Sequence, residues 1–279
     1  MAVDLHTHSN FSDGSDSPTR IIDLAVAADL TTVALTDHDG VDGVDEAAQA
    51  AEGRIGFIPG VELSVRWEDR AAHLLVYWLT PDSPLSDLLG EIRDDRASRN
   101  REMVAALVSL GIEITEDEIA TESGRGVTGR PHIAAVLVAK GAVGSIPEAF
   151  DQYLAEGRPA YRGRLRLDLT RATALAKESG SVAVIAHPHT IADNEDSFRH
   201  LFETMRDVGV DGVECHYAEY APEMRQRLAG YARSLGLVPT GGSDYHGTYK
   251  QGIDLAFGRG DLVVPDTVVV ELEERRARA

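Results

Sequence analysis

The chain has 279 residues, of which 43% are hydrophobic and 26% are charged, and its formal net charge is −19 at pH 7. This composition is typical of a soluble globular protein, and the negative charge opposes binding to duplex nucleic acid, which normally uses many Lys and Arg contacts to phosphate. No apolar run approaches the roughly 20 residues of a membrane span, no secretory signal precedes the first strand, and the single cysteine, Cys215, excludes an intramolecular disulfide. We therefore expect one main domain, monomeric and cytoplasmic, with Cys215 as a small core residue.

The first predicted strand leads into the sequence Asp4-Leu5-His6-Thr7-His8. Residues two apart in an extended chain point to the same side, so Asp4, His6 and His8 form a row. Two imidazoles on one side can hold a divalent metal through neutral nitrogens, and a nearby carboxylate can orient a ring. For an isolated pair of histidines, a solvated polar turn would be the more common explanation. The positions of the other histidines in the chain favour the metal.

Short β-rich runs recur along the chain, and each is followed by a polar cluster and an amphipathic helical stretch. This alternation predicts parallel βα units. Ser17 and Pro18 fit the start of the first helix, and Gly180, Gly209 and Gly236 fit the ends of helices that precede later strands. The predicted strands are 2–5, 32–35, 56–61, 73–79, 182–186, 210–214 and 237–240.

The pattern changes between residues 80 and 163, where helical stretches follow one another without β-rich runs. We interpret 80–163 as a small helical insertion, and 1–79 together with 164–279 as a barrel. Helices are expected over 85–110 as one helix or two, from the capping box at Thr115, and over 130–140 and 147–156. The insertion carries a basic cluster that is either a solvated helix face paired with acidic neighbours or a binding surface. Its members are Arg93, Arg96, Arg99, Arg101, Arg125, Arg130 and His132.

Histidines and carboxylates follow most predicted strands at their C-terminal ends, where the loops of an α/β barrel converge. His73 is different because it begins its strand, and we expect that strand to be antiparallel or to bend into the site. Nine candidate ligands exceed the four to six that one ion uses, so they predict two or three metals that share bridging carboxylates. Ligands of this kind without thiolate suit Mn²⁺, Fe²⁺ or Zn²⁺. The candidates are His6, His8, Asp13, His38, Glu62, His73, His187, Asp244 and His246.

The balance of charge among these ligands indicates a class of substrate. Three divalent ions would bring six positive charges, the carboxylates Asp13, Glu62 and Asp244 would remove three, and a bound hydroxide would remove one. The remainder of about +2 matches a phosphate monoester dianion, and clustered metals are suited to phosphoryl transfer. An uncharged amide substrate would need no such surplus.

Five motifs occur in a fixed order along the chain: Asp4-x-His6-x-His8, Thr36-Asp37-His38-Asp39, Gly60-Val61-Glu62, Ala186-His187-Pro188-His189 and Gly242-Ser243-Asp244-x-His246. In order and context they resemble the motifs of the polymerase and histidinol phosphatase (PHP) family. The resemblance spans essentially the whole chain. It implies a distorted (β/α)7 barrel whose di- or trinuclear metal centre, with Mn²⁺ as the first choice, hydrolyses phosphoesters.

Within that family, the Asp13 position, His73 and the helical insertion are most similar to the branch of nucleoside 3′,5′-bisphosphate phosphatases and 5′-to-3′ oligoribonucleases. The resemblance implies a small nucleotide or short oligonucleotide as substrate and binding of its phosphates by the inserted helices. We expect Asp39 to orient water or substrate, and His189 to contact substrate or simply to lie in a loop. The implied substrate-binding residues of the insertion are Arg96, Arg99, Asn100, Arg101, Arg130 and His132.

Two other interpretations stay open at this point. A small-molecule phosphatase of the histidinol-phosphate type would keep the metal ligands but would have no use for the arginines of the insertion. A non-catalytic metal-binding module would fit better if one of the ligands were missing. Glu214 and His216 end a predicted strand on the active face, but neither belongs to a ligand motif.

Overall fold

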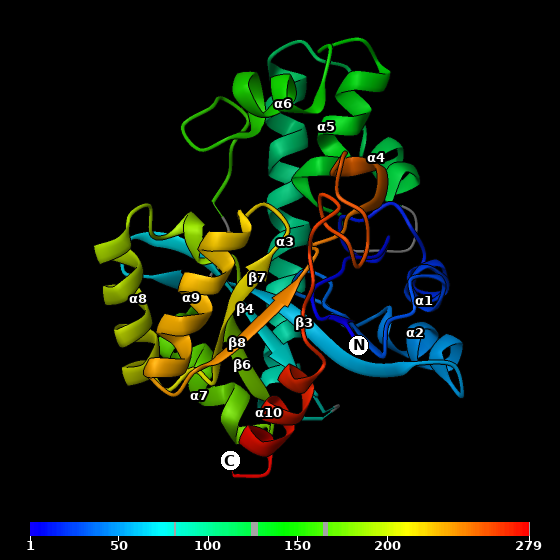
Figure 1. Cartoon of the computed structure of the whole chain (residues 1–279). Helices are drawn as coiled ribbons and strands as arrows, with labels where there is room; N and C mark the ends of the chain where they lie inside the picture. The colour runs from blue at the N-terminus through cyan, green and yellow to red at the C-terminus, as the bar shows by residue number, and fades with distance from the viewer. Residues whose placement is uncertain (81, 124–127, 164–166, 279) are drawn as a thin grey trace.

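Seven strands of the computed structural model form a nearly closed barrel, and the structure describes residues 1–80, 82–123, 128–163 and 167–278 (Figure 1). The first and last strands meet where the Leu5 N–H donates to the Gly241 carbonyl at 3.2 Å. This arrangement confirms the predicted barrel. The strands, in sheet order, are β1 (Val3–Asp4), β2 (Thr32–Leu35), β3 (Gly56–Trp67), β4 (Arg70–Tyr77), β6 (Val182–Ile185), β7 (Gly212–Tyr217) and β8 (Val238–Gly242), and β5 (Leu167–Asp168) pairs with β3.

The strand β4 runs antiparallel to both of its neighbours, β3 and β6, whereas the other neighbouring pairs are parallel. This confirms the antiparallel alternative for the strand of His73. His73 pairs with Ser64 inside the strand and does not begin it, because β4 starts at Arg70. β3 extends to Trp67, beyond the predicted end at residue 61, because β4 folds back on it as a hairpin.

Helices cover the outside of the barrel and close one end of it (Figure 1). Ser17 accepts a hydrogen bond from the Arg20 N–H, as expected for an N-cap, and Gly209 ends its helix with φ +91°. The helices are α1 (Pro18–Ala27), α2 (Val44–Ala51), α7 (Leu169–Glu178), α8 (Glu195–Val208), α9 (Pro222–Ser234) and α10 (Thr267–Arg276), with short turns η2 (Pro188–Thr190) and η3 (Gly247–Tyr249).

The inside of the barrel is filled by apolar side chains from most of its strands. Val3, Leu75, Val184 and Val238 belong to this cluster, together with Leu272 from α10. A second cluster packs the other face of the sheet against α7, α8 and α9. Burial of these side chains stabilises the barrel by about 1.5–3 kcal/mol for each large residue, so we expect the fold to persist without metal ions.

The helices after β4 form a separate apolar cluster, and one long helix joins it to the barrel (Figure 1). Leu85 and Ile92 of this helix pack on the barrel, whereas Met103 and Leu107 pack among the inserted helices. The helical segments are α3 (Pro84–Ser109), α4 (Glu116–Ser123), α5 (Arg130–Ala139), α6 (Ile146–Ala149) and the π-helix η1 (Phe150–Leu154).

The region predicted to hold one helix or two thus holds a single helix, α3. Thr115 and Glu118 form the expected capping box, with each side chain bonded to the other residue's backbone N–H. The division of the chain at residues 80 and 163 stays a prediction, and its boundary at 164 lies outside the described residues, as does Arg125 of the predicted basic cluster. Over the described ranges, no helix has the length and apolar character needed to cross a membrane.

Candidate metal centre

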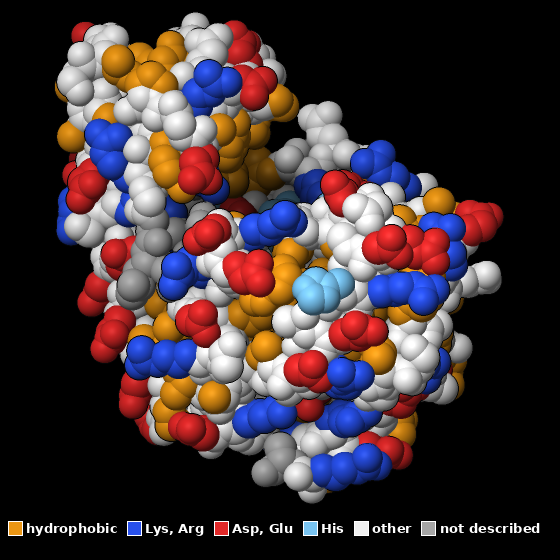
Figure 2. Space-filling model, turned by 90° about the vertical axis from the view of Figure 1, so that its left-hand side faces the viewer, with side chains coloured by type: hydrophobic (Ala, Val, Ile, Leu, Met, Phe, Trp, Pro, Cys, Tyr) orange, Lys and Arg blue, Asp and Glu red, His pale blue; other side chains and the backbone are white. Residues whose placement is uncertain are grey.

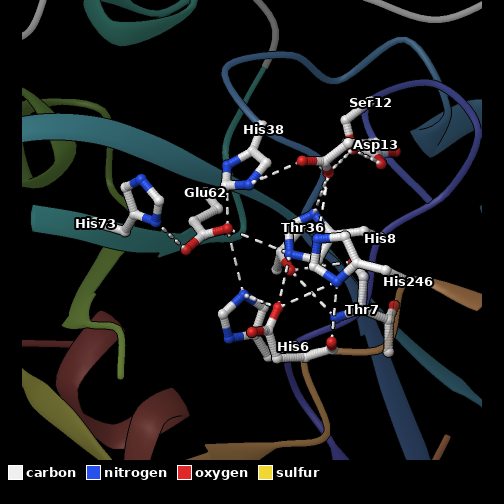
Figure 3. A network of polar contacts seen from close by, with 12 residues as sticks. His6, Thr7, His8, Ser12, Asp13, Thr36, His38, Glu62, His73 and His246 are labelled. Carbon is white, nitrogen blue, oxygen red and sulfur yellow. Dashed lines mark hydrogen bonds and ion pairs between the residues drawn. The ribbon is translucent and has the colours of Figure 1, made fainter. Parts of the chain in front are cut away.

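All nine predicted ligands lie close together, in loops and strands that are far apart in sequence. Figure 3 labels all of them except His187 and Asp244. Within each of three groups, the potential ligand atoms lie within 4.8 Å of one another. His187 joins them through Glu62, whose Oε1 lies 2.9 Å from His187 Nε2. The groups are His6, His8 and Asp244; His38, Glu62 and His73; and His8, Asp13, His38 and His246.

The buried carboxylate of Glu62 lies in the middle of the cluster (Figure 3). Its Oε2 lies 3.3 Å from His6 Nε2 and 3.2 Å from His8 Nε2. Its other oxygen, Oε1, lies 2.8 Å from His73 Nδ1 and 2.9 Å from His187 Nε2. Each oxygen therefore faces a different set of imidazoles, which is the arrangement of a carboxylate that bridges two ions.

Asp13 is part of the cluster because a tight turn brings it back toward the first strand. Asp13 Oδ1 lies 3.3 Å from His246 Nε2, and its Oδ2 lies 3.5 Å from His38 Nε2. The turn requires glycine at position 14, since a Cβ there would lie 2.2 Å from the His8 carbonyl oxygen. Asp13, His38 and His246 thus form a third possible position for an ion.

Several buried ring nitrogens in the cluster have no hydrogen-bond partner in the part of the chain that the structure describes. Buried polar atoms are normally paired, so a concentration of unpaired nitrogens indicates a ligand. Neutral imidazole nitrogens that face carboxylates are the donors that divalent transition metals prefer. The residues therefore fit a multinuclear metal site. The unpaired atoms are His6 Nε2, His8 Nδ1 and Nε2, His38 Nδ1 and His187 Nδ1.

The electrostatics of the cluster also fit cations. Burial alone would raise the pKa of Glu62 and of Asp244, but the surrounding imidazoles hold both well below their usual range. Burial alone would lower the pKa of His8, but Asp244 and Glu62 raise it to about 10. The pKa values of His6 and His187 are raised as well, so in the absence of metal, protons on these three imidazoles would balance the carboxylates, and metal ions would replace those protons.

Glu214 is a functional residue that the motifs did not identify. Its Oε1 lies 3.0 Å from His6 Nδ1, and its Oε2 accepts a hydrogen bond from the His187 N–H at 2.7 Å. It therefore orients the His6 ring with Nε2 toward the cluster, and it holds His187 in a strained conformation with φ +25°. The position of Glu214 at the end of a predicted strand on the active face was the signal that could have found it.

Asp244 also has partners that sequence reasoning missed. Its Oδ2 accepts hydrogen bonds from Lys250 Nζ at 2.7 Å and from the Tyr217 hydroxyl at 2.8 Å. Its Oδ1 lies 3.4 Å from His6 Nε2 and 3.3 Å from His8 Nε2. One oxygen is thus left for an ion. No motif in the sequence identifies Lys250 or Tyr217 as members of the site.

Asp39 is buried beside the cluster and has several donors. Its carboxylate accepts hydrogen bonds from the Ser64 N–H at 2.7 Å and hydroxyl at 2.9 Å, and it forms a short ion pair with Arg96. This geometry supports a positioning role toward Arg96. Contact of Asp39 with water or substrate stays a prediction.

A cavity of about 310 Å³ adjoins the candidate ligands. His38, His73 and His187 line it together with Asp13, and Arg96, Arg99 and Arg130 line it from the inserted helices. Figure 2 shows the surface hollowed between the inserted helices and the barrel. A cavity with candidate metal ligands on one side and arginines on the other is suited to an anion with more than one charged group.

Asn100 and Arg101, the other predicted substrate-binding residues of α3, are not among the described residues that line this cavity. Asn100 accepts hydrogen bonds from the Arg99 side chain and donates to the Thr128 carbonyl, so it supports Arg99. Arg101 is exposed and lines a larger cavity of about 830 Å³ on another face of α3, with Phe11. That cavity contains none of the predicted metal ligands among the described residues that line it, and contact of Arg101 with substrate stays a prediction without support from this geometry.

His132 and His189 each have a defined partner. Burial lowers the pKa of His132, and its Nδ1 accepts a hydrogen bond from the Gly129 N–H, which leaves the proton on Nε2. His189 Nδ1 lies 2.9 Å from the Tyr220 hydroxyl, and its ring centroid lies 6.0 Å from that of His187. Contact of either histidine with substrate stays a prediction.

Comparisons with known proteins agree with this geometry. Residues 4–249 match the family described as PHP domain. The 3′,5′-nucleoside bisphosphate phosphatase of Chromobacterium violaceum is 34% identical over 279 residues, which cover 99% of this chain and 98% of that protein. A 5′-3′ exoribonuclease of Haemophilus influenzae is 34% identical over 87% of this chain and 89% of its own. A solved structure from Bifidobacterium adolescentis, described as a proposed metal-dependent phosphoesterase, has a TM-score of 0.85 at 31% identity and covers 98% of this chain and 96% of its own.

Proposed function

The chain belongs to the PHP domain family and is a metal-dependent phosphoesterase, and we propose that it removes a phosphate from nucleoside 3′,5′-bisphosphates. The observation that carries the proposal is the cavity in which candidate metal ligands face Arg99 and Arg130. A bisphosphate has one phosphate for each side of that cavity. We also propose stepwise hydrolysis of short 5′-phosphorylated RNA as a related activity, because the relative from Haemophilus influenzae is named a 5′-3′ exoribonuclease.

The candidate ligands would hold two or three divalent ions, with Mn²⁺ as the first choice and Fe²⁺ or Zn²⁺ as alternatives. One ion would take His6, His8 and Asp244, with Glu62 shared with a second ion at His73 and His187. A third would take Asp13, His38 and His246. Bound ions would supply positive charge to the phosphoryl oxygens and lower the pKa of a water molecule.

The chain's own residues bind and orient the substrate. Arg99 and Arg130 would hold the phosphate that is not hydrolysed, because a guanidinium can donate two parallel hydrogen bonds to phosphate oxygens. Asn100 would keep the Arg99 guanidinium in place through its Oδ1, which lies 2.7 Å from Arg99 Nη2. The cavity volume of about 310 Å³ lies at the lower end of the range for small-ligand sites, about 300–1,000 Å³.

A substrate comparison tests this proposal. The purified protein, reconstituted with Mn²⁺, would be assayed with adenosine 3′,5′-bisphosphate, AMP, histidinol phosphate and a short 5′-phosphorylated RNA. We expect the highest kcat/KM for the bisphosphate. Equal or faster turnover of histidinol phosphate or AMP would contradict the proposal and favour a small-molecule phosphatase that makes no use of the inserted arginines.

A further inference from the structure

The guanidinium of Arg130 is held by aromatic rings of two neighbouring segments. Arg130 Cζ lies 5.5 Å from the ring centroid of Phe150 and 5.8 Å from that of Tyr161. Arg130 Nη1 also donates a hydrogen bond to the Leu154 carbonyl at 3.3 Å. Arg130 starts α5, whereas these three partners follow α6 in the chain, so the contacts are tertiary.

The backbone from Phe150 to Tyr161 brings the three partners of Arg130 close to its guanidinium. Phe150 and Leu154 are the first and last residues of the π-helix η1, a form that is rare and occurs frequently at functional sites. Phe150 also lines the cavity of about 310 Å³ beside the candidate metal ligands. The turn after η1 then returns Tyr161, whose N–H donates to the Arg158 carbonyl at 3.0 Å.

The three partners of Arg130 named above carry no charge, in contrast to the partner of Arg96. Asp39 forms an ion pair with Arg96 and balances its charge. Aromatic faces attract a guanidinium and restrict its rotation without neutralising it. The two rings therefore order the long, flexible side chain of Arg130 before the substrate arrives, which reduces the entropy lost on binding.

We propose that Phe150 and Tyr161 are positioning residues that hold Arg130 for the second phosphate of the substrate. They would thereby contribute to the preference for bisphosphates over monophosphates. This inference rests on the proposed function, because it assumes that Arg130 contacts a phosphate. It adds two residues that act through Arg130 rather than on the metal centre.

The variants Phe150→Leu and Tyr161→Leu remove one ring each and test the inference. With adenosine 3′,5′-bisphosphate and the Mn²⁺ protein, we expect each to raise KM about 2- to 30-fold and to change kcat less than twofold, the range that a cation–π contact implies. The KM for p-nitrophenyl phosphate, which has one phosphate, should change less than twofold. The conservative variant Tyr161→Phe keeps the ring and should restore the parental KM.

A binding measurement supplies a readout that does not depend on turnover. Isothermal titration of adenosine 3′,5′-bisphosphate into the metal-free protein should give a Kd that rises by the same factor in both leucine variants. Circular dichroism checks that the variants fold. Among the described residues, the apolar cluster of the inserted helices includes Phe150 at its edge but not Tyr161, so Tyr161→Leu keeps the test possible if Phe150→Leu fails to fold.

The variant Arg130→Ala separates failure of this inference from failure of the proposed function. If Arg130→Ala raises KM for the bisphosphate but neither leucine variant does, the positioning role is wrong and the proposed function survives. If only Phe150→Leu raises KM, its ring contacts the substrate directly, and the positioning role is again wrong. If Arg130→Ala also leaves KM unchanged, the contact of Arg130 with a second phosphate is wrong, and both proposals lose their support.

Discussion

Glu214 Oε1 lies 3.0 Å from His6 Nδ1, although the two residues are 208 positions apart in the chain. The same carboxylate holds the backbone N–H of His187 through its other oxygen. Glu214 thus sets the orientation of two candidate ligands from different strands. Partners of this kind fix the tautomer and direction of a metal-binding imidazole.

We predict that Glu214→Gln weakens Mn²⁺ binding about 10- to 100-fold, as is typical when such a partner is lost. The amide fits the same space, but it weakens the hydrogen bond that orients His6. Titration of the metal-free protein with Mn²⁺ measures the effect. The matched control is Glu223→Gln, an exposed position in the first turn of α9. Equal Mn²⁺ affinity in the two variants would show that Glu214 does not orient the His6 ring.

Metal content is the second prediction. Because candidate ligands form three groups, we expect two to three equivalents of transition metal by elemental analysis. Chelation should abolish hydrolysis and leave the circular dichroism spectrum largely unchanged, since apolar clusters stabilise the barrel. The variants His8→Ala and Asp244→Ala should likewise lose hydrolysis and keep a largely unchanged circular dichroism spectrum. One equivalent or fewer after reconstitution with excess Mn²⁺ would contradict a multinuclear centre.

The third prediction concerns pH and the metal-free protein. Carboxylates raise the pKa of His8 to about 10, from 6.5 in the unfolded chain. A raised pKa contributes stability that is fully present below about 6.5 and is lost as the pH rises through about 10. We therefore expect the Tm of the chelated protein to fall between pH 7 and pH 10.

Mn²⁺ should remove most of this dependence, because bound imidazoles are neutral and metal binding releases their protons. Differential scanning calorimetry of the chelated and the Mn²⁺-loaded protein across the same pH range makes the comparison. A Tm that rises from pH 7 to pH 10 in the chelated protein would show that the imidazoles do not hold these protons.

Most of the candidate ligands that lie in the cluster could be identified from sequence, because strand periodicity and position determine where they lie. Alternation along the first strand placed His6 and His8 on one side, and both lie in the cluster. The contacts of Glu214 and Lys250 could not be predicted, because they depend on the distance between side chains of different loops. The two-residue strand β5 was also missed, since so short a segment has no periodicity.

The basic cluster of the insertion shows a different limit of the sequence. Residues two apart on a helix point about 200° from each other, so Arg99 and Arg101 lie on nearly opposite faces of the helix and cannot line the same side of a cavity. Arg99 lines the cavity beside the metal ligands, whereas Arg101 is exposed on another face. Helical periodicity alone could separate the two residues, but only the packing of α3 on the barrel determines which of them faces the metals.

The fourth prediction excludes a covalent intermediate on cysteine. Cys215 is fully buried, and burial raises the pKa of its thiol well above the usual range, so it is a poor nucleophile. Cys215→Ser should leave turnover within a few-fold. Hydrolysis in ¹⁸O-water should place one label in the released phosphate. A trapped phosphoprotein, or a loss of about 10³-fold or more, would contradict direct attack by water.

The fifth prediction tests whether Arg99, which lines the cavity beside the candidate metal ligands, recognises the second phosphate of the substrate. A charge-assisted contact to that group is worth about 1.5 to 3 kcal/mol where water is partly excluded. Arg99→Ala should therefore lower kcat/KM for adenosine 3′,5′-bisphosphate by roughly 10- to 150-fold. A generic aryl phosphate should be affected much less, because it has no second phosphate for Arg99 to bind.

Arg93→Ala is the matched control for Arg99→Ala, because Arg93 lies on the same helix but is exposed and pairs with Asp42 at 3.3 Å. It should change neither substrate's kcat/KM by more than about twofold, since an exposed ion pair contributes at most about 1 kcal/mol to stability. If Arg99→Ala lowers turnover of both substrates equally, Arg99 supports the structure of the site rather than the recognition of a second phosphate. If it lowers neither, the basic cluster is a solvated helix face, and phosphatases of the histidinol-phosphate type become the better comparison.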